Sequence, residues 1–166
     1  KELAKKIKSP HRNAVRMLLK ISAYNKQDTL LPDKWEIEHI FPQKWQSTYF
    51  PNVTDDIVKE KIEHIGNKLP FEKKLNIIAG NGYFVKKKNE YVISSITITK
   101  NFGESSSSDW TLDDITERDL QVSTEVMDTL TNWKQEYNTP PGNSLHSEAT
   151  PEELAMIKDF KKRGLI

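Results

Sequence analysis

The stretch Trp35-Glu36-Ile37-Glu38-His39-Ile40-Phe41-Pro42 combines the pattern of a short strand with reactive side chains. Its first four residues alternate between apolar and acidic side chains, as in a strand with one buried face. The proline at its end stops the strand, because proline cannot donate a hydrogen bond to a neighbouring strand. A strand that only packs does not require a histidine directly after an acid. We therefore expect functional residues in this stretch.

Two further segments complete a small structural unit. Residues 66–71 read as a second extended segment, and residues 72–79 as a short helix that ends at Gly80-Asn81-Gly82. The order of strand, strand and helix predicts a ββα finger at about residues 35–80. Apolar residues at helical spacing predict further helices at about 10–24, 54–65 and 83–94, and a long helix that reaches Tyr137. The predicted fold class is mainly α with a small antiparallel β element (α+β), the finger being embedded in a helical domain.

The predicted organisation is one domain at residues 1–138, followed by a linker at 139–150 and a terminal helix at 151–166. The linker is rich in Pro, Gly and Ser. The N-terminus has neither a Met nor the apolar core of a signal peptide, so we expect a piece of a longer protein.

The sequence pattern leaves two features of the later helices open and predicts a third. Residues 96–99 alternate like a strand but could continue the preceding helix. Either Thr111 or Thr116 could cap the long helix, since Thr116 stands three residues before an acid. Four apolar residues on or near one face of that helix are expected in the core: Leu120, Met127, Leu130 and Tyr137.

Composition limits the possible functions. Charged residues make up 30% and hydrophobic residues 36% of the 166 residues, as in a polar globular protein. No apolar run approaches the roughly 20 residues that a membrane span needs, so we expect no membrane contact and a cytoplasmic location. The absence of cysteine excludes disulfides and thiolate metal sites.

The charges are unevenly distributed along the chain. The segment 59–88 contains eight Lys and three Glu, whereas the segment 104–128 contains eight acids and one Arg. The basic segment is either a solvated face or a surface that meets phosphates. The candidates for phosphate or DNA contacts in it are Lys68, Lys73, Lys86 and Lys87.

The residues of the finger suit hydrolysis of a phosphodiester. His39 can remove a proton from water, because the unperturbed pKa of histidine lies near neutral pH. Glu38 and the amide oxygen of Asn76 are two hard ligands for Mg²⁺, or Mn²⁺, which completes its shell with water and phosphate oxygens. Such an ion can stabilise the charge that develops on the phosphate.

The strand geometry raises one difficulty. Adjacent residues on a regular strand point to opposite faces. Glu38 and His39 can serve one site only if the strand is bent or bulged there, or if they flank the site. Glu36, on the same face as Glu38, is a reserve candidate for the acidic ligand.

Taken together, these motifs resemble the HNH, or His-Me finger, nuclease superfamily. More narrowly they resemble the C-terminal nuclease domain of GmrSD-type and phosphorothioate-sensing restriction proteins. The resemblance covers roughly Ala14 to Tyr137, and it rests on an ordered set: Glu38-His39-Ile40-Phe41-Pro42, Gly66-Asn67-Lys68-Leu69, Asn76 and Phe84-x-x-Lys87-x-x-x-Tyr91. Two positions depart from these relatives, where many have Asp in place of Glu38 and Leu in place of Lys68.

The resemblance implies a role for each motif residue. His39 would be the general base of a ββα-metal (His-Me) finger, and Glu38 and Asn76 would be metal ligands. Asn67 would orient the histidine or pin the neighbouring loop. Lys87 would either contact phosphate or have a structural role.

The resemblance also implies a biological setting. Relatives of this kind restrict phage or modified DNA, and they carry an N-terminal nucleotide-dependent domain similar to ParB-like proteins. The expected function is therefore a DNA endonuclease or nickase domain in the antiviral defence of a bacterium or archaeon. A homo-oligomer is one assembly that we expect it could form. Two alternatives remain open: a non-catalytic DNA-binding or protein-docking module of the same fold, and a nuclease that acts on RNA.

Overall fold

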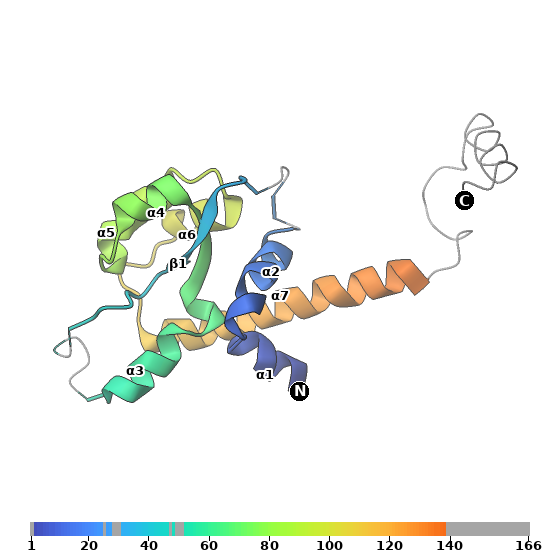
Figure 1. Ribbon diagram of the computed structural model, residues 1–166, viewed down its shortest axis with the longest axis horizontal. Helices are drawn as coiled ribbons and strands as arrows, with labels where there is room; N and C mark the ends of the chain where they lie inside the picture. The colour runs from blue at the N-terminus through green and yellow to red at the C-terminus, as the bar shows by residue number, and fades with distance from the viewer. Residues whose placement is uncertain (1, 25, 28–30, 47, 49–51, 139–166) are drawn as a thin grey trace, which may run out of the picture. The chain divides into compact units, whose positions relative to one another are not determined.

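The computed structural model describes residues 2–24, 26–27, 31–46, 48 and 52–138. The predicted linker at 139–150 and the predicted helix at 151–166 lie outside these residues. The chain divides into one unit at Lys1–Thr131, which contains the strand pair and the core, and a second at Asn132–Ile166. In chain order the elements are α1 (Glu2–Lys8), α2 (Arg12–Tyr24), β1 (Trp35–His39), α3 (Asp55–Ile62), the 3₁₀ turn η2 (Ile65–Asn67), β2 (Lys68–Glu72), α4 (Lys73–Ala79), α5 (Phe84–Val92), α6 (Thr97–Glu104) and α7 (Leu112–Asn138) (Figure 1).

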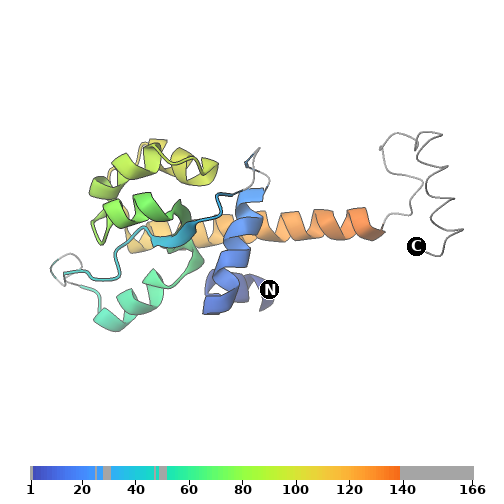
Figure 2. The same ribbon diagram turned by 45° about the horizontal axis from the view of Figure 1, so that its top comes forward.

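The two strands form an antiparallel pair in regular register. Glu38 lies opposite Leu69, and His39 lies opposite Lys68. Helix α4 follows β2 without a gap and packs against both strands, as the two views of the ribbon show (Figures 1 and 2). The predicted class, mainly helical with a small antiparallel β element, is confirmed.

A mixed aliphatic and aromatic core holds the strand pair against the helices. It draws residues from the segment after β1, from α3, β2, α4 and α5, and from the start of α7. Its buried members are Ile40, Phe41, Val58, Ile62, Leu69, Phe71, Ala79, Phe84, Tyr91, Trp110 and Ile115. In the described part of the chain, no helix has both the length and the apolar character that crossing a membrane requires.

Helix α7 begins at a capping box formed by Thr111 and Asp114. The Asp114 carboxylate accepts a hydrogen bond from the Thr111 backbone N–H at 2.7 Å, and the Thr111 hydroxyl accepts one from the Asp114 N–H at 3.3 Å. Each side chain thereby satisfies an N–H group that the helix leaves unpaired. Thr116 lies inside the helix, where its hydroxyl donates to the Leu112 carbonyl, so its proposed capping role is wrong.

The buried face of α7 differs from the predicted apolar stripe. Leu120 is 62% exposed and Tyr137 is 89% exposed, which contradicts their expected place in the core. The buried positions of α7 include polar ones, among them Asp119 and Ser123. At Asp119 the reason is contact with η2, because its carboxylate accepts a hydrogen bond from the Gly66 N–H. The apolar residues that α7 does bury include Val122 and Val126.

Residues 96–99 neither form a strand nor continue α5. Helix α6 starts afresh at Thr97, after a break that follows Val92. A Cβ atom at Gly103 would lie 2.7 Å from the Cβ of Tyr91, so this glycine lets α6 pack closely on α5. The Thr99 hydroxyl, buried in the same region, donates to the Pro70 carbonyl at 2.5 Å and joins α6 to β2.

Candidate functional site

His39 ends β1 with its ring partly buried. Its side chain is 17% exposed, and Nε2 is buried without a hydrogen-bond partner among the described residues. Burial lowers the pKa of His39 from 6.5 to about 4, and the nearby positive charge of Lys68 adds to the effect. The imidazole is therefore unprotonated at neutral pH, which is the state that a general base requires.

An acid that the sequence reasoning missed lies beside this ring. Glu63 follows α3, and its Oε1 is 3.7 Å from His39 Nε2. Lys68 lies opposite His39 on β2, and its Nζ donates to Glu63 Oε2 at 2.9 Å. In the sequence Glu63 is one of several charges on a polar helix, so only the register of β1 with β2 could have indicated its place.

Glu38 is held by residues of α5. The Tyr91 hydroxyl donates to Glu38 Oε1 at 2.7 Å, and Lys87 Nζ pairs with the same oxygen at 2.7 Å. Lys87 Nζ also donates to the His39 carbonyl at 2.5 Å. Burial and the Glu38 charge raise the pKa of Tyr91 well above 10, so its hydroxyl remains a donor.

The strand is regular where Glu38 and His39 lie, so their side chains leave on opposite faces. The contacts agree, because Glu38 meets α5 whereas His39 meets the end of α3. The regular register leaves no bulge that would turn the two side chains toward one site. Glu36 is exposed, whereas Glu38 is buried.

Asn67 pins the segment that follows His39. It is fully buried, and its amide donates to the carbonyls of Phe41 and Ile62, both at 3.0 Å. Its Oδ1 accepts from the Phe41 N–H at 2.7 Å, and its backbone carbonyl accepts from Ile40. Asn67 makes no hydrogen bond to the His39 ring. Its geometry therefore matches the loop-pinning role and not the direct orientation of the base.

The carboxylate oxygens of Glu38 and the amide oxygen of Asn76 are ligand atoms of the type that a hard divalent cation binds. The Glu38 carboxylate is held through Oε1, which accepts a hydrogen bond from the Tyr91 hydroxyl and pairs with Lys87 Nζ. Asn76 lies on α4, is partly exposed and makes no side-chain hydrogen bond to a described residue. The described residues contain no group of three or more His, Cys, Asp or Glu side chains that could hold a metal. A small number of protein ligands is enough for Mg²⁺, because this ion keeps several water molecules in its shell.

The four candidate lysines divide into two pairs. Lys68 and Lys87 are buried and are engaged with Glu63 and Glu38 respectively. Lys73 and Lys86 are exposed on α4 and α5. The basic segment of the sequence is therefore not a uniform basic surface. Of these four lysines, only Lys73 and Lys86 have their charged groups in solvent.

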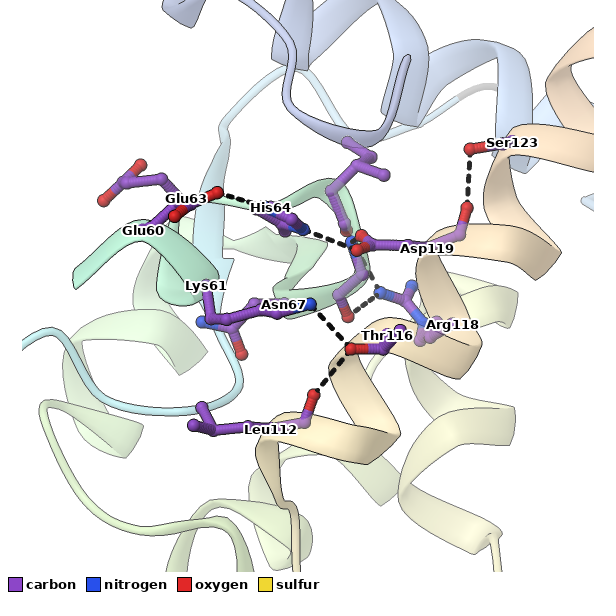
Figure 3. Close-up of polar contacts among 12 residues, drawn as sticks. Glu60, Lys61, Glu63, His64, Asn67, Leu112, Thr116, Arg118, Asp119 and Ser123 are labelled. Atoms are coloured by element: carbon purple, nitrogen blue, oxygen red, sulfur yellow. Dashed lines mark hydrogen bonds and ion pairs between the residues drawn. The ribbon is translucent and has the colours of Figure 1, made fainter. Parts of the chain in front are cut away.

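Two residues of α7 hold the turn that carries Asn67 (Figure 3). Arg118 Nη1 donates to the carbonyls of Gly66 at 2.7 Å and Lys68 at 2.9 Å. Asp119 Oδ1 accepts from the Gly66 N–H at 2.8 Å. Burial lowers the pKa of Arg118 to about 10, which leaves it charged at neutral pH.

His64 contacts a buried acid of α7. Its Nδ1 lies 2.6 Å from Asp119 Oδ2, and the pair is shown in Figure 3. The helix predicted at about 54–65 ends earlier, since α3 ends at Ile62 and His64 is the N-cap of η2. Gly66 lies in η2, where a Cβ atom would come within 2.2 Å of the Ile115 carbonyl.

A hollow of about 590 Å³ lies among α2, α6 and α7. An ion pair between Lys26 and Glu125, which line it, spans 2.5 Å. None of the residues predicted for the site lines this hollow. The candidate site therefore lies elsewhere, around the strand pair.

Comparison with known proteins places the chain in a family. The family model for the C-terminal domain of GmrSD restriction endonucleases matches residues 2–123. No curated protein and no solved structure matches the chain. The matched range includes the strand pair, α4 and the part of α7 that holds η2. The chain belongs to this family, and it is a nuclease domain of a restriction system, whose substrate is DNA.

Proposed function

We propose, from the membership of the chain in the GmrSD C-terminal family, that it is a metal-dependent DNA endonuclease domain of the HNH (His-Me finger) type in an anti-phage restriction protein. The observation that carries the proposal is the state of His39. Its ring is unprotonated at neutral pH and lies at the end of β1, one residue after an acid whose side chain leaves the opposite face of the strand. A base and a metal ligand on the two sides of β1 would supply the two groups that hydrolysis of a phosphodiester needs.

In this proposal His39 takes a proton from a water molecule. The oxygen of that water forms a bond to the phosphorus of the DNA backbone, while the bond from phosphorus to the 3′ oxygen breaks and the 3′ oxygen takes a proton from solvent. The imidazolium that results returns its proton to solvent. The lowered pKa of His39 favours this return, because the buried ring holds a proton weakly.

Glu38 and Asn76 would hold the divalent cation, through Oε2 and through the amide oxygen. Tyr91 and Lys87 fix the other Glu38 oxygen, as partners behind a metal ligand commonly do. When bound, Mg²⁺ or Mn²⁺ supplies stabilisation of the negative charge on the phosphate and on the leaving oxygen. Asn67 acts at a distance, by keeping the segment after His39 in place.

The DNA backbone would be held by exposed lysines near the strand pair. Lys73 and Lys86 are available for this role, whereas Lys68 and Lys87 act from inside the protein, on Glu63 and Glu38. Lysine binds phosphate as a point charge without base preference. These lysines would therefore hold the DNA backbone independently of its base sequence or modification.

Relaxation of supercoiled plasmid tests the proposal. The wild-type chain should nick plasmid in Mg²⁺ or Mn²⁺, and His39→Ala should lower the rate by roughly 10²- to 10⁴-fold, the usual contribution of a general base. His11→Ala is the matched control, because His11 is exposed at the start of α2 and far in sequence from the finger. If His39→Ala nicks as fast as wild type, the proposed base is wrong.

One observation favours a second candidate, a non-catalytic DNA-binding module of the same fold. The ion pair of Lys87 with Glu38 neutralises the acid without a metal. In that case the wild-type chain would bind plasmid and leave it uncut at every concentration of Mg²⁺ or Mn²⁺. Single-stranded RNA offered in the same assay separates an RNA-directed nuclease from both.

We also propose that the chain works with a nucleotide-dependent, ParB-like sensor domain in the full-length protein or complex. One catalytic site per chain makes one nick. Cleavage of both strands would therefore require two copies or two encounters.

A further inference from the structure

The structure assigns to Glu63 the role of positioning residue for His39, held in place by Lys68. The inference rests on the proposed function, since it concerns the base of that reaction. Glu63 comes from the end of α3, outside the motifs that predicted the site, and it is a different acid from the proposed metal ligand Glu38.

The first step is the state of the His39 ring. Nε2 is buried and has no hydrogen-bond partner among the described residues. A buried polar atom without a partner is rare in folded proteins and calls for an explanation. Glu63 Oε1, at 3.7 Å, is a carboxylate oxygen facing that nitrogen. This distance is longer than a hydrogen bond, and hydrogen bonds of catalytic groups are often long before the substrate binds.

The second step is the way Lys68 fixes the acid. Lys68 Nζ donates to Glu63 Oε2 at 2.9 Å and to the Glu63 carbonyl at 2.5 Å. The Lys68 side chain is only 5% exposed, and lysine is rarely buried unless it is paired. Lys68 thus holds Oε2, while Oε1 lies toward His39, and the Gln43 side chain is a further partner of the same carboxylate. Although partial burial raises the pKa of Glu63, its bond to Lys68 lowers that pKa overall, so the carboxylate is charged.

The third step is the consequence for the base. A His39 Nε2–H that donates to Glu63 leaves Nδ1 as the nitrogen that accepts the proton from water. The carboxylate also stabilises the imidazolium formed in that step. This is the order of base, orienting acid and supporting group that nucleophilic enzymes use, here built from three elements of the fold. Glu38 cannot serve in this way, because its side chain leaves the opposite face of β1 and is held by Tyr91 and Lys87.

Steady-state nicking by Glu63→Ala tests the role. We expect kcat to fall roughly 10- to 100-fold with KM nearly unchanged, because the base is misplaced while the DNA contacts remain. Glu63→Asp, which keeps the carboxylate, should recover part of the loss. Glu60→Ala is the matched control, since Glu60 is an exposed acid on the same helix, and it should nick like wild type. In Glu63→Ala the buried Lys68 keeps its bond to the backbone carbonyl of residue 63, so it retains one partner.

A second measurement does not depend on cutting. Long-range ¹H–¹⁵N spectra of histidine-labelled protein at one fixed pH report which nitrogen of His39 carries the proton. We expect the Nε2–H form in wild type and a mixture of the two tautomers in Glu63→Ala, with His39→Ala used to assign the signals. Unchanged His39 signals together with unchanged kcat would overturn the inference, as would recovery of Glu63→Ala by raised metal concentration, which would make Glu63 a ligand. If wild type itself does not nick, the proposed function fails, while the spectra still decide on the contact.

Discussion

At the scale of single residues, Lys86 and Lys87 are neighbours with opposite surroundings. Lys87 is buried against Glu38 and the His39 carbonyl, whereas Lys86 is exposed. Lys87→Met would leave the buried Glu38 charge without its cation, so we expect a loss of about 3–5 kcal/mol in the free energy of unfolding. Lys86→Met should change it by less than about 0.5 kcal/mol. Urea unfolding followed by circular dichroism measures both, and equal stability of the two variants would contradict the ion pair.

The depressed pKa of His39 makes a prediction about acid stability. Folded His39 titrates at about 4 and the ordinary value is 6.5, so between these pH values the unfolded chain binds the proton more strongly. The contribution of His39 is therefore complete above pH 6.5 and is lost as the pH falls toward 4, by about 1–3 kcal/mol. His39→Gln should show a shallower decline than wild type in urea unfolding across this range. His11→Gln, changed at an exposed position, should decline as steeply as wild type.

Sequence reasoning found the kinds of residues at the site but not all of their partners. The order of strand, strand and helix could be predicted, with His39 on the first strand and Asn76 on the helix, whereas Asn67 lies in η2, just before the strand on which it was expected. The partners of Glu38 could not, since Tyr91 is 53 positions away and reaches it only through the packing of α5 on the strand pair. Glu63 was missed for the same reason. From the sequence alone, a charged residue such as Glu63 at the end of a helix is expected to be solvated. Only the position of the neighbouring strands shows its partners.

At the scale of elements, the contact of α7 with η2 depends on the absence of a side chain at Gly66. A Cβ atom there would lie 2.2 Å from the Ile115 carbonyl and 2.8 Å from the Asp119 nitrogen, both of which are backbone atoms. Gly66→Ala should therefore cost roughly 1–3 kcal/mol, as overpacking usually does. Gly82→Ala is the control, because its closest contact is the flexible Lys86 side chain at 3.2 Å. A Gly66→Ala variant as stable as Gly82→Ala in thermal unfolding would rule out this close approach.

The same contact explains why the apolar pattern of α7 misled. Hydrophobic periodicity assumes that a helix buries its apolar face against other apolar side chains. Here the buried face meets the backbone of a turn, so Asp119 is buried and Leu120 is exposed. The hydrogen-bonding groups of η2 were invisible to a method that scores only side-chain hydropathy. The short elements of the finger were predicted better, since Pro and Gly mark their ends.

At the scale of the whole molecule, the basic segment of the sequence and the charged surface of the protein differ. Lys68 and Lys87 are internal, whereas Lys73, Lys74 and Lys86 of the same segment are exposed. Replacement of these three by Gln should weaken plasmid binding and should reduce the slope of log affinity against log salt by about 0.9 for each phosphate that is no longer neutralised. Fluorescence anisotropy in a salt series measures the slope. A slope that does not change would assign these lysines to solvation alone.

The hydrogen bond of the Gly66 N–H also makes this amide a probe of the contact between α7 and η2. Its proton is donated to the buried Asp119 carboxylate, so it can exchange with deuterium only when α7 separates from η2. The exchange rate of this single amide therefore measures how often the long helix undocks from η2. It offers a way to follow, in a uniformly labelled sample, whether DNA or a partner domain tightens or loosens that contact.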